Sequence, residues 1–230
     1  KKKIWSFQET SHDLWNLDLA SPPILTSMKK SGKMIDIVVA PSKSGNTLIL
    51  DRLTGKPIYP YLLKKAETSI VPGEKTSEYQ PKLQVPEPFE NIFFKKEDIR
   101  NEFKEDFLNN DYEFGWYKTP KFDKKHLRGG IIGGAQWPGA SIDHKNNIMY
   151  VTSNNIIFES KIDLVSNGKN RAPVYKSSHK RLLENNLYPK NSPPWGTLNA
   201  LNLNTGKLLW KVPLGNYDSF KTENKEFTGT

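Results

Sequence analysis

Two segments of the chain share one pattern, and this repeat constrains the fold more than any other feature. Residues 46–59 read NTLILDRLTGKPIY and residues 198–210 read LNALNLNTGKLLW. The matched positions are Leu50/Leu201, Asp51/Asn202, Thr54/Thr205, Gly55/Gly206, Lys56/Lys207, Ile58/Leu209 and Tyr59/Trp210. Each copy predicts a strand, a tight Thr-Gly turn and a second strand that ends in an aromatic residue. Repeated antiparallel meanders of this kind indicate a β-propeller, although two unrelated hairpins with a common turn would explain the repeat equally well.

The rest of the chain favours an all-β fold. Short apolar runs bounded by Gly, Asn, Pro or Asp predict further strands over 35–42, 140–144, 147–154, 196–203 and 207–214. Ile99, Phe103 and Phe107 repeat every four residues and predict one helix over 95–110, and residues 180–188 predict one short helical turn. The Pro-rich residues 71–89 have no periodicity and read as a long ordered connection.

Composition excludes several kinds of site. The chain of 230 residues has no cysteine, which rules out disulfides, thiolate metal sites and cysteine nucleophiles, and its four histidines show no metal-ligand spacing. Its 34 Lys+Arg against 25 Asp+Glu give a net charge of +9. The lysines are scattered as pairs, so a solvated basic surface is a better interpretation than a nucleic-acid site. No apolar run is long enough for a membrane helix and no signal peptide is present, while both ends read as cut from a longer chain.

Residues 12–23, HDLWNLDLASPP, concentrate polar side chains around a tryptophan. Leu14, Asn16 and Asp18 alternate with Trp15, Leu17 and Leu19, which fits a short strand with Asn16 and Asp18 on one side. A polar loop closing onto an edge strand is the interpretation that the pattern alone favours, and Pro22-Pro23 excludes a helix that continues further.

Six segments, in this order along the chain, resemble those of a known family. They are SFQETSHDLWNLDLASPPIL, VVAPSKSGNTLILDRLTGKPIYP, VPGEKTSEYQPKL, GGAQWPGASID, MYVTSNN and PPWGTLNALNLNTGKLLWKVPLG. Together they resemble the quinoprotein dehydrogenases that use pyrroloquinoline quinone (PQQ), in the membrane-bound, glucose-dehydrogenase-like branch. The resemblance implies an eight-bladed propeller, of which residues 1–230 would supply two to three blades of a single domain. It also implies a long irregular and helical insertion over roughly residues 64–130, and a chain that is a fragment or a truncated relative.

The resemblance also implies cofactors and site residues. In this family a calcium ion polarises a carbonyl of PQQ, hydride passes to the quinone, and an aspartate takes the hydroxyl proton of the substrate. Asn16 stands at the position of that aspartate, where its amide oxygen could ligate Ca²⁺ but could not take a proton. Asp18 is either a substitute base or ligand, or simply the cap of a strand. His12 and Asp13 would orient the segment by hydrogen bonds.

Further cofactor contacts follow from the same resemblance. Lys43 matches a cation that contacts the quinone carbonyls, with a surface lysine as the alternative. Gln136 and Trp137 lie in a phrase that resembles a loop over the cofactor, although Trp137 would also suit a filler between blades. The 27 residues from Asn16 to Lys43 leave room for one out-and-back strand pair. Trp195 and Trp210 are interpreted as aromatics that pack between blades.

The predicted function is therefore that of a bacterial quinoprotein dehydrogenase segment. It would oxidise an aldose or another alcohol and pass electrons to a quinone, in the periplasm and in association with the inner membrane only through parts outside this chain. Asn16 favours a second interpretation, a catalytically silent propeller that binds or scaffolds. A nucleic-acid binder, suggested only by the net charge, would require a steep salt dependence of DNA binding.

Overall fold

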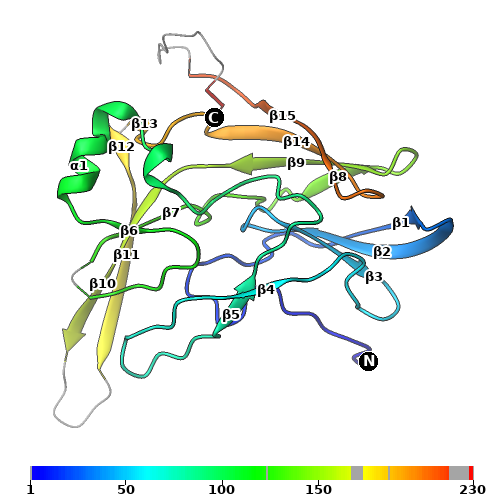
Figure 1. The fold of residues 1–230 in the computed structure, drawn as a ribbon, viewed down its shortest axis with the longest axis horizontal. Helices are drawn as coiled ribbons and strands as arrows, with labels where there is room; N and C mark the ends of the chain where they lie inside the picture. Colours follow the sequence, from blue (N-terminus) through cyan, green and yellow to red (C-terminus); the bar gives the residue numbers. More distant parts are fainter. Residues whose placement is uncertain (1, 123, 167–172, 186, 218–227, 230) are drawn as a thin grey trace.

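The computed structural model describes all residues except 1, 123, 167–172, 186, 218–227 and 230. It is built mainly from antiparallel sheets (Figure 1). One sheet is a meander of β1 (Ile24–Lys30), β2 (Lys33–Pro41) and β3 (Thr47–Asp51). A second runs in the order β15 (Leu208–Pro213), β14 (Gly196–Asn202), β9 (Ile148–Asn154) and β8 (Ala140–Asp143).

A third sheet carries the longest hairpin of the described chain. Its order is β11 (Val174–Arg181), β10 (Phe158–Ser166), β7 (His126–Arg128) and β6 (Glu113–Phe114), and only β6 and β7 are parallel. Two small pairs, β4 (Leu63–Lys65) with β5 (Tyr79–Pro81) and β12 (Leu183–Glu184) with β13 (Tyr188–Pro189), complete the strands. Figure 1 shows the β10–β11 hairpin extending away from the two other large sheets.

The two copies of the repeat form the same turn. Asp51 Oδ1 accepts hydrogen bonds from the backbone N–H groups of Leu53 and Thr54, and Asn202 Oδ1 accepts those of Asn204 and Thr205. The glycine that follows has φ of +70° in Gly55 and +71° in Gly206, a conformation that glycine adopts without steric cost. Asp51 with Gly55, and Asn202 with Gly206, therefore form the same turn in both copies, as predicted.

The strands after the two turns differ. In the second copy β15 pairs with β14 along most of its length, whereas the first copy forms only an isolated bridge between Leu50 and Pro57. Pro57 has no N–H to donate, and Pro60 follows it closely. The predicted second strand of the first copy is therefore wrong.

The first two sheets share one hydrophobic core. Met28, Ile37, Val39 and Ile49 from the β1–β3 meander pack with Met149, Val151 and Leu201 from the β8–β15 sheet, and all seven are at most 3% exposed. Phe89, from the Pro-rich connection, joins the same core at 1% exposure. The meanders are thus stacked face to face, which is how successive blades of a propeller pack.

The helical predictions are only partly correct. Residues 95–110 contain η1 (Lys96–Asp98), η2 (Asn101–Phe103) and α1 (Lys104–Asn109) rather than one continuous helix. Ile99 interrupts the helix with an extended conformation, pairs with Asn191, and is buried with Phe107 in a second core. The predicted helical turn over 180–188 is wrong, because most of its described residues lie in β11, β12 and β13 and none of them is helical; Asn186 lies outside the described residues.

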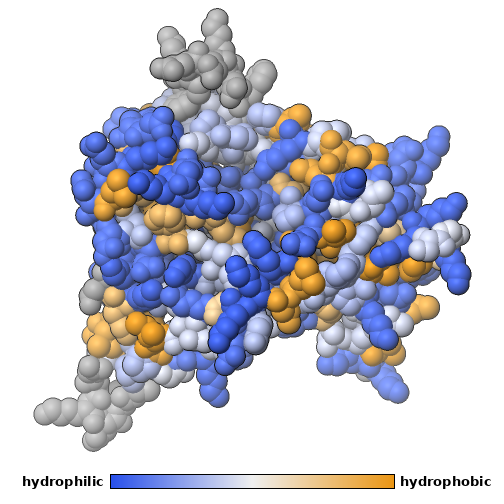
Figure 2. All heavy atoms as spheres, viewed as in Figure 1, coloured by the Kyte–Doolittle hydropathy of each residue, from blue (hydrophilic) through white to orange (hydrophobic). Residues whose placement is uncertain are grey.

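Hydrophilic side chains dominate the face drawn in Figure 2, with apolar side chains interspersed among them. Over the described part of the chain, no helix has the length and hydropathy needed to cross a bilayer.

Candidate functional site

The segment from His12 to Leu19 is a loop held by its own aspartate. Asp13 Oδ1 accepts the N–H of Trp15 at 2.9 Å and Asp13 Oδ2 accepts that of Leu17 at 2.7 Å. Asn16 has φ of +60°, a left-handed conformation that asparagine tolerates better than most residues. Because this conformation interrupts an extended chain, the segment is a loop, as the pattern alone favoured, and not a short strand.

The predicted alternation of sides is nevertheless present. Trp15 and Leu17 are buried at 3% and 1% exposure, and the indole N–H of Trp15 donates to the carbonyl of Lys118 at 2.7 Å. Asn16 and Asp18 are exposed on the opposite side. The apolar pair therefore anchors the loop, and the two polar side chains are presented together.

Lys43 lies in the tight loop between β2 and β3 and is buried at 6% exposure, so it is not a surface lysine. Its Nζ donates to Asp18 Oδ1 at 2.7 Å and to Asn16 Oδ1 at 3.3 Å. Strands β1 and β2 are the out-and-back pair that brings Lys43 beside Asn16, as the spacing predicted. The carboxylate of Asp18 therefore forms an ion pair and does not cap a strand.

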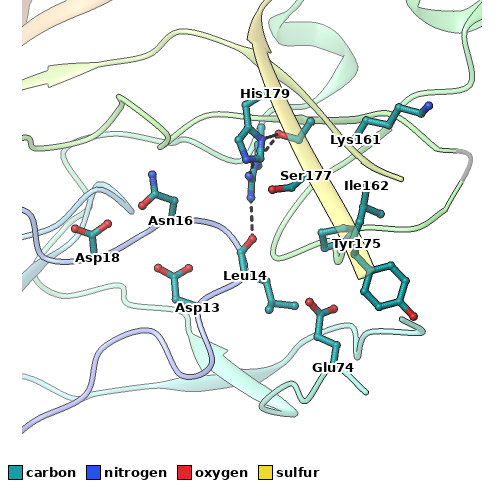
Figure 3. A pocket seen from close by; sticks show the side chains of 13 residues that line it. Asp13, Leu14, Asn16, Asp18, Glu74, Lys161, Ile162, Tyr175, Ser177 and His179 are labelled. Atoms are coloured by element: carbon teal, nitrogen blue, oxygen red, sulfur yellow. Dashed lines mark hydrogen bonds between the residues drawn. The ribbon is translucent and has the colours of Figure 1, made fainter. Parts of the chain in front are cut away.

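A cavity of about 570 Å³ lies beside this group, and Asn16 and Asp18 line it. Figure 3 shows them on one side of the cavity and His179 and Ser177, from β11, on another. Its remaining wall includes Asp13, Glu74 and Arg128. A cavity of this size can hold a small polar molecule.

The glycine-rich loop after β7 packs against the Lys43 loop through its backbone. Gly134 has φ of +59°, and a Cβ there would lie 2.1 Å from the carbonyl oxygen of Lys43. Ala135 donates its N–H to the carbonyl of Ser42 at 3.1 Å. Only a residue without a side chain allows this approach, so the two loops hold each other in position.

The side chains of Gln136 and Trp137 do not reach the cavity wall in the described part of the chain. Gln136 donates from Nε2 to the carbonyl of Gly133 at 3.4 Å, and Trp137 is 77% exposed. The structure therefore brings together Asn16, Asp18 and Lys43, but not the two predicted residues of the glycine-rich loop. Of the predicted blade-packing aromatics, Trp195 is fully buried, whereas Trp210 is 41% exposed beside Tyr150.

Glu9 supports the Lys43 loop from within the protein, and sequence reasoning did not identify it. Its Oε1 accepts hydrogen bonds from the hydroxyls of Ser42 and Ser44, both at 2.9 Å, on either side of Lys43. Burial raises the pKa of the Glu9 carboxyl to about 7. The hydrogen bonds from Ser42 and Ser44 oppose this rise, and the nearby charge of Asp13 adds to it. The sequence around Glu9 contains no pattern that marks this glutamate as buried.

Arg128 and His179 are also residues that the sequence did not single out. Arg128 Nε donates to Ser160 Oγ at 2.9 Å and Nη1 donates to the carbonyl of Leu14 at 3.0 Å, so it ties β7 to β10 and to the Asn16 loop. Burial lowers the pKa of the His179 imidazole, and the charge of Arg128 lowers it further. His179 is therefore neutral at pH 7.

The described residues do not by themselves form a metal centre. Within them, no group of three or more His, Cys, Asp or Glu side chains could hold a metal ion. Asn16 and Asp18 offer side-chain oxygens, but the ammonium of Lys43 already lies between them. Calcium takes six to eight oxygen ligands, so these residues do not fit a complete calcium site.

Comparison with known proteins identifies relatives of the whole chain. The sequence model of the PQQ family, described as the β-propeller domain of glucose/ethanol/alcohol dehydrogenases, matches residues 2–229. The chain is 28% identical over 240 residues to the quinate/shikimate dehydrogenase (quinone) of Acinetobacter baylyi, covering 93% of this chain and 30% of that protein. It is 26% identical over 250 residues to quinoprotein glucose dehydrogenase A of Acinetobacter calcoaceticus, with the same coverage of 93% and 30%.

A solved structure shares the fold. The quinohemoprotein alcohol dehydrogenase from Comamonas testosteroni superposes with a TM-score of 0.51 and 18% identity, over 90% of this chain and 26% of that one. Together with the family match, this superposition confirms the predicted β-propeller. The chain spans about 30% of the length of the two sequence relatives, so it corresponds to part of such a propeller.

Proposed function

The chain belongs to the PQQ family of glucose/ethanol/alcohol dehydrogenase β-propellers, and on that premise we propose that the complete protein is a quinoprotein dehydrogenase that oxidises an aldose or another alcohol. The observation that carries this proposal is the buried ammonium of Lys43, which contacts Asn16 and Asp18. Asn16 and Asp18 line the cavity, and Lys43 lies behind them rather than in its wall. A buried cation next to a cavity suits a cofactor on which negative charge develops.

The chemistry of Lys43 fits a quinone. An ammonium has three N–H donors, and two of those of Lys43 go to Asn16 and Asp18. Among the residues that the structure describes, no side chain or carbonyl accepts the third. PQQ, when bound, would supply the redox chemistry by accepting the two electrons of the alcohol. Lys43 would donate to a quinone oxygen and stabilise the negative charge that develops on it.

Asp18 is the best candidate to receive the proton of the alcohol. Its Oδ1 accepts from Lys43, whereas no donor in the described part of the chain reaches Oδ2. Its side chain is 50% exposed and lines the cavity, so a substrate hydroxyl could approach it. Asn16 at the family position of the base would then orient the hydroxyl with its amide, because an amide does not take up a proton at neutral pH.

A catalytically silent propeller is the second candidate function. The specific observation in its favour is Asn16, which replaces the residue expected to be the base. In that case the cavity would bind a small molecule without oxidising it. Calcium, a quinone as electron acceptor and a periplasmic location at the inner membrane stay predictions from the resemblance, and no step proposed for these residues depends on them.

The experiment uses the complete protein, reconstituted with PQQ and assayed for dye reduction with a panel of sugars and alcohols. Asp18→Asn should lower the rate by roughly two to four orders of magnitude, the usual contribution of a general base. Asp36→Asn is the matched control, since Asp36 is also a half-exposed aspartate in an ion pair, with Arg52. It should leave the rate unchanged.

The two candidate functions predict different results. If the native protein binds PQQ and oxidises an alcohol, and Asp18→Asn removes that activity, the dehydrogenase proposal stands. PQQ binding without any oxidation, or no PQQ binding at all, would instead favour the silent propeller. An active Asp18→Asn protein would reject Asp18 as the base while leaving the dehydrogenase proposal intact.

A further inference from the structure

The loop that carries Lys43 is held from behind by Glu9. Glu9 Oε1 accepts hydrogen bonds from the hydroxyls of Ser42 and Ser44, both at 2.9 Å. These two serines are the direct neighbours of Lys43 along the chain, and both are buried. The carboxyl of Glu9, which is buried as well, therefore holds the residues on both sides of the lysine.

The same stretch of chain holds the other end of Lys43. Its ammonium donates to Asp18 Oδ1 at 2.7 Å and to Asn16 Oδ1 at 3.3 Å, and both residues belong to the segment 9–18 that begins with Glu9. This segment thus contacts Lys43 through its head group and through its two neighbours. The four-carbon stem of a lysine is flexible, so the direction in which the ammonium points depends on both contacts.

The other contacts of the two serine hydroxyls stay within their own loop. The serine oxygens lie 2.6 Å apart, Ser44 Oγ accepts from Asn46 Nδ2 at 2.9 Å, and Ser42 Oγ lies 3.4 Å from the carbonyl oxygen of Asn46. These contacts shape the loop but do not fix its position relative to residues 9–18. In the described part of the chain, only the bonds to Glu9 tie the two hydroxyls to another segment.

Glu9 accepts these hydrogen bonds as an uncharged acid at slightly acidic pH. Burial raises the pKa of its carboxyl to about 7, and the charge of Asp13 adds to this rise. Burial also raises the pKa of the neighbouring phenols of Tyr61 and Tyr117, so both are uncharged. At pH 6 the carboxyl is therefore mostly protonated, and Oε1 accepts without adding a negative charge to a region that already contains Asp13.

We propose that Glu9 is a positioning residue that directs the ammonium of Lys43 toward the quinone, by holding Ser42 and Ser44 against residues 9–18. This inference rests on the proposed function, because it concerns the residue that would contact the cofactor. The role requires an acceptor at the position of Glu9 Oε1 and no charge there. Glutamine should therefore replace Glu9, whereas leucine should not.

The first test measures the PQQ affinity of the complete protein by equilibrium dialysis at pH 6. Glu9→Leu should weaken binding at least about tenfold, because a misdirected Lys43 loses its charge-assisted hydrogen bond to the quinone. Glu9→Gln should bind PQQ as the native protein does. Ser42→Ala removes one of the same hydrogen bonds from the side of the loop and should also weaken binding, so the result does not depend on how a leucine packs at residue 9.

A double-mutant cycle separates positioning from a general loss of structure. In the Lys43→Ala background, adding Glu9→Leu should change PQQ affinity little, because no ammonium is left to position. Glu159→Leu is the matched control. Glu159 is a buried glutamate on β10, and its ion pairs are with Lys125 and Lys180. Its effect on PQQ affinity, of whatever size, should be the same with and without Lys43→Ala.

The second test does not need the cofactor. Amine labelling followed by mass spectrometry gives the reactivity of each lysine in the protein without PQQ. Lys43 is buried and should react slowly in the native protein and in Glu9→Gln, but faster in Glu9→Leu. Lys96 is exposed and should react at the same rate in all three proteins.

Three results would overturn the proposal. They are native PQQ affinity with native Lys43 labelling in Glu9→Leu, an equal loss of affinity in Glu9→Gln and Glu9→Leu, and additive effects of Glu9→Leu and Lys43→Ala. The proposed function has a separate failure. If the protein binds no PQQ but Lys43 becomes more reactive in Glu9→Leu, Glu9 does position Lys43 and the quinoprotein proposal is wrong.

Discussion

Glu9 provides a pH-dependent test of how the Lys43 loop is supported. The carboxyl is 5% exposed, and burial raises its pKa from 4.5 to about 7. A raised carboxyl pKa means that the folded state prefers the protonated form. The stability contributed by that form is complete below pH 4.5 and is lost as the pH rises through about 7. Since one pKa unit corresponds to about 1.4 kcal/mol, the loss amounts to about 3 kcal/mol above pH 8.

Glu9→Gln should remove this dependence, because glutamine has nearly the same shape and stays neutral. Its Oε1 can still accept from Ser42 and Ser44. Urea unfolding of the complete protein, followed from pH 4.5 to pH 8.5, should show the variant gaining stability relative to the native protein by about 3 kcal/mol as the pH rises.

Glu90→Gln is the control for Glu9→Gln. Glu90 is equally buried at 5% exposure, but its Oε2 is ion-paired with Lys211 at 2.8 Å and accepts from Ser153 at 2.9 Å. Removing its charge leaves Lys211 without the carboxylate of its ion pair, so this variant should be less stable than the native protein throughout the range. If the two variants respond to pH in the same way, or if Glu9→Gln gains nothing above pH 7, the buried carboxyl does not have the assigned role.

Three further predictions concern the site. Lys43→Ala should weaken PQQ binding at least about tenfold in equilibrium dialysis, since a charge-assisted hydrogen bond is lost; unchanged affinity would limit Lys43 to its ion pair with Asp18. Gly134→Ala should lower the free energy of unfolding in urea by several kcal/mol, because the new Cβ would clash with the Lys43 carbonyl. Gly32 is the control, since its φ is +79° and no atom lies within 4 Å of the added Cβ, and Gly32→Ala should cost only about 1–2 kcal/mol. Asn16→Asp should raise Ca²⁺ affinity in calorimetry, and equal affinity would show that the charge at this position does not control metal binding.

The parts of the fold that were predictable depend on local chemistry. The turns at Asp51–Gly55 and Asn202–Gly206 are determined by a side chain that caps its own backbone and by a glycine with positive φ, and both lie within five residues. The alternation of Trp15 and Leu17 with Asn16 and Asp18 was also readable. The backbone conformation of that loop was not, because it depends on Asp13 and on the left-handed Asn16.

The rest of the site depends on contacts between distant residues. Lys43 is buried by segments 25 or more positions away, and Arg128 contacts Leu14 across 114 positions. The hairpin of β10 and β11, which carries Ser160, Ser177 and His179, gave a weak strand signal because most of its side chains are polar and at least partly exposed. Polar strands of this kind lack the apolar alternation from which strands are predicted.

The conformation of Asn16 bears on why an amide stands at this position. Its φ of +60° is tolerated by aspartate as well as by asparagine, so the backbone does not require the amide. Charge distinguishes the two residues. With Asn16, the ammonium of Lys43 and the carboxylate of Asp18 balance each other. An aspartate would place two carboxylates around one ammonium, and the excess negative charge would favour either a proton or a divalent cation. Compared with an aspartate, Asn16 therefore makes the site less favourable for a metal ion and cannot act as a base. It leaves Asp18 as the carboxylate beside Lys43.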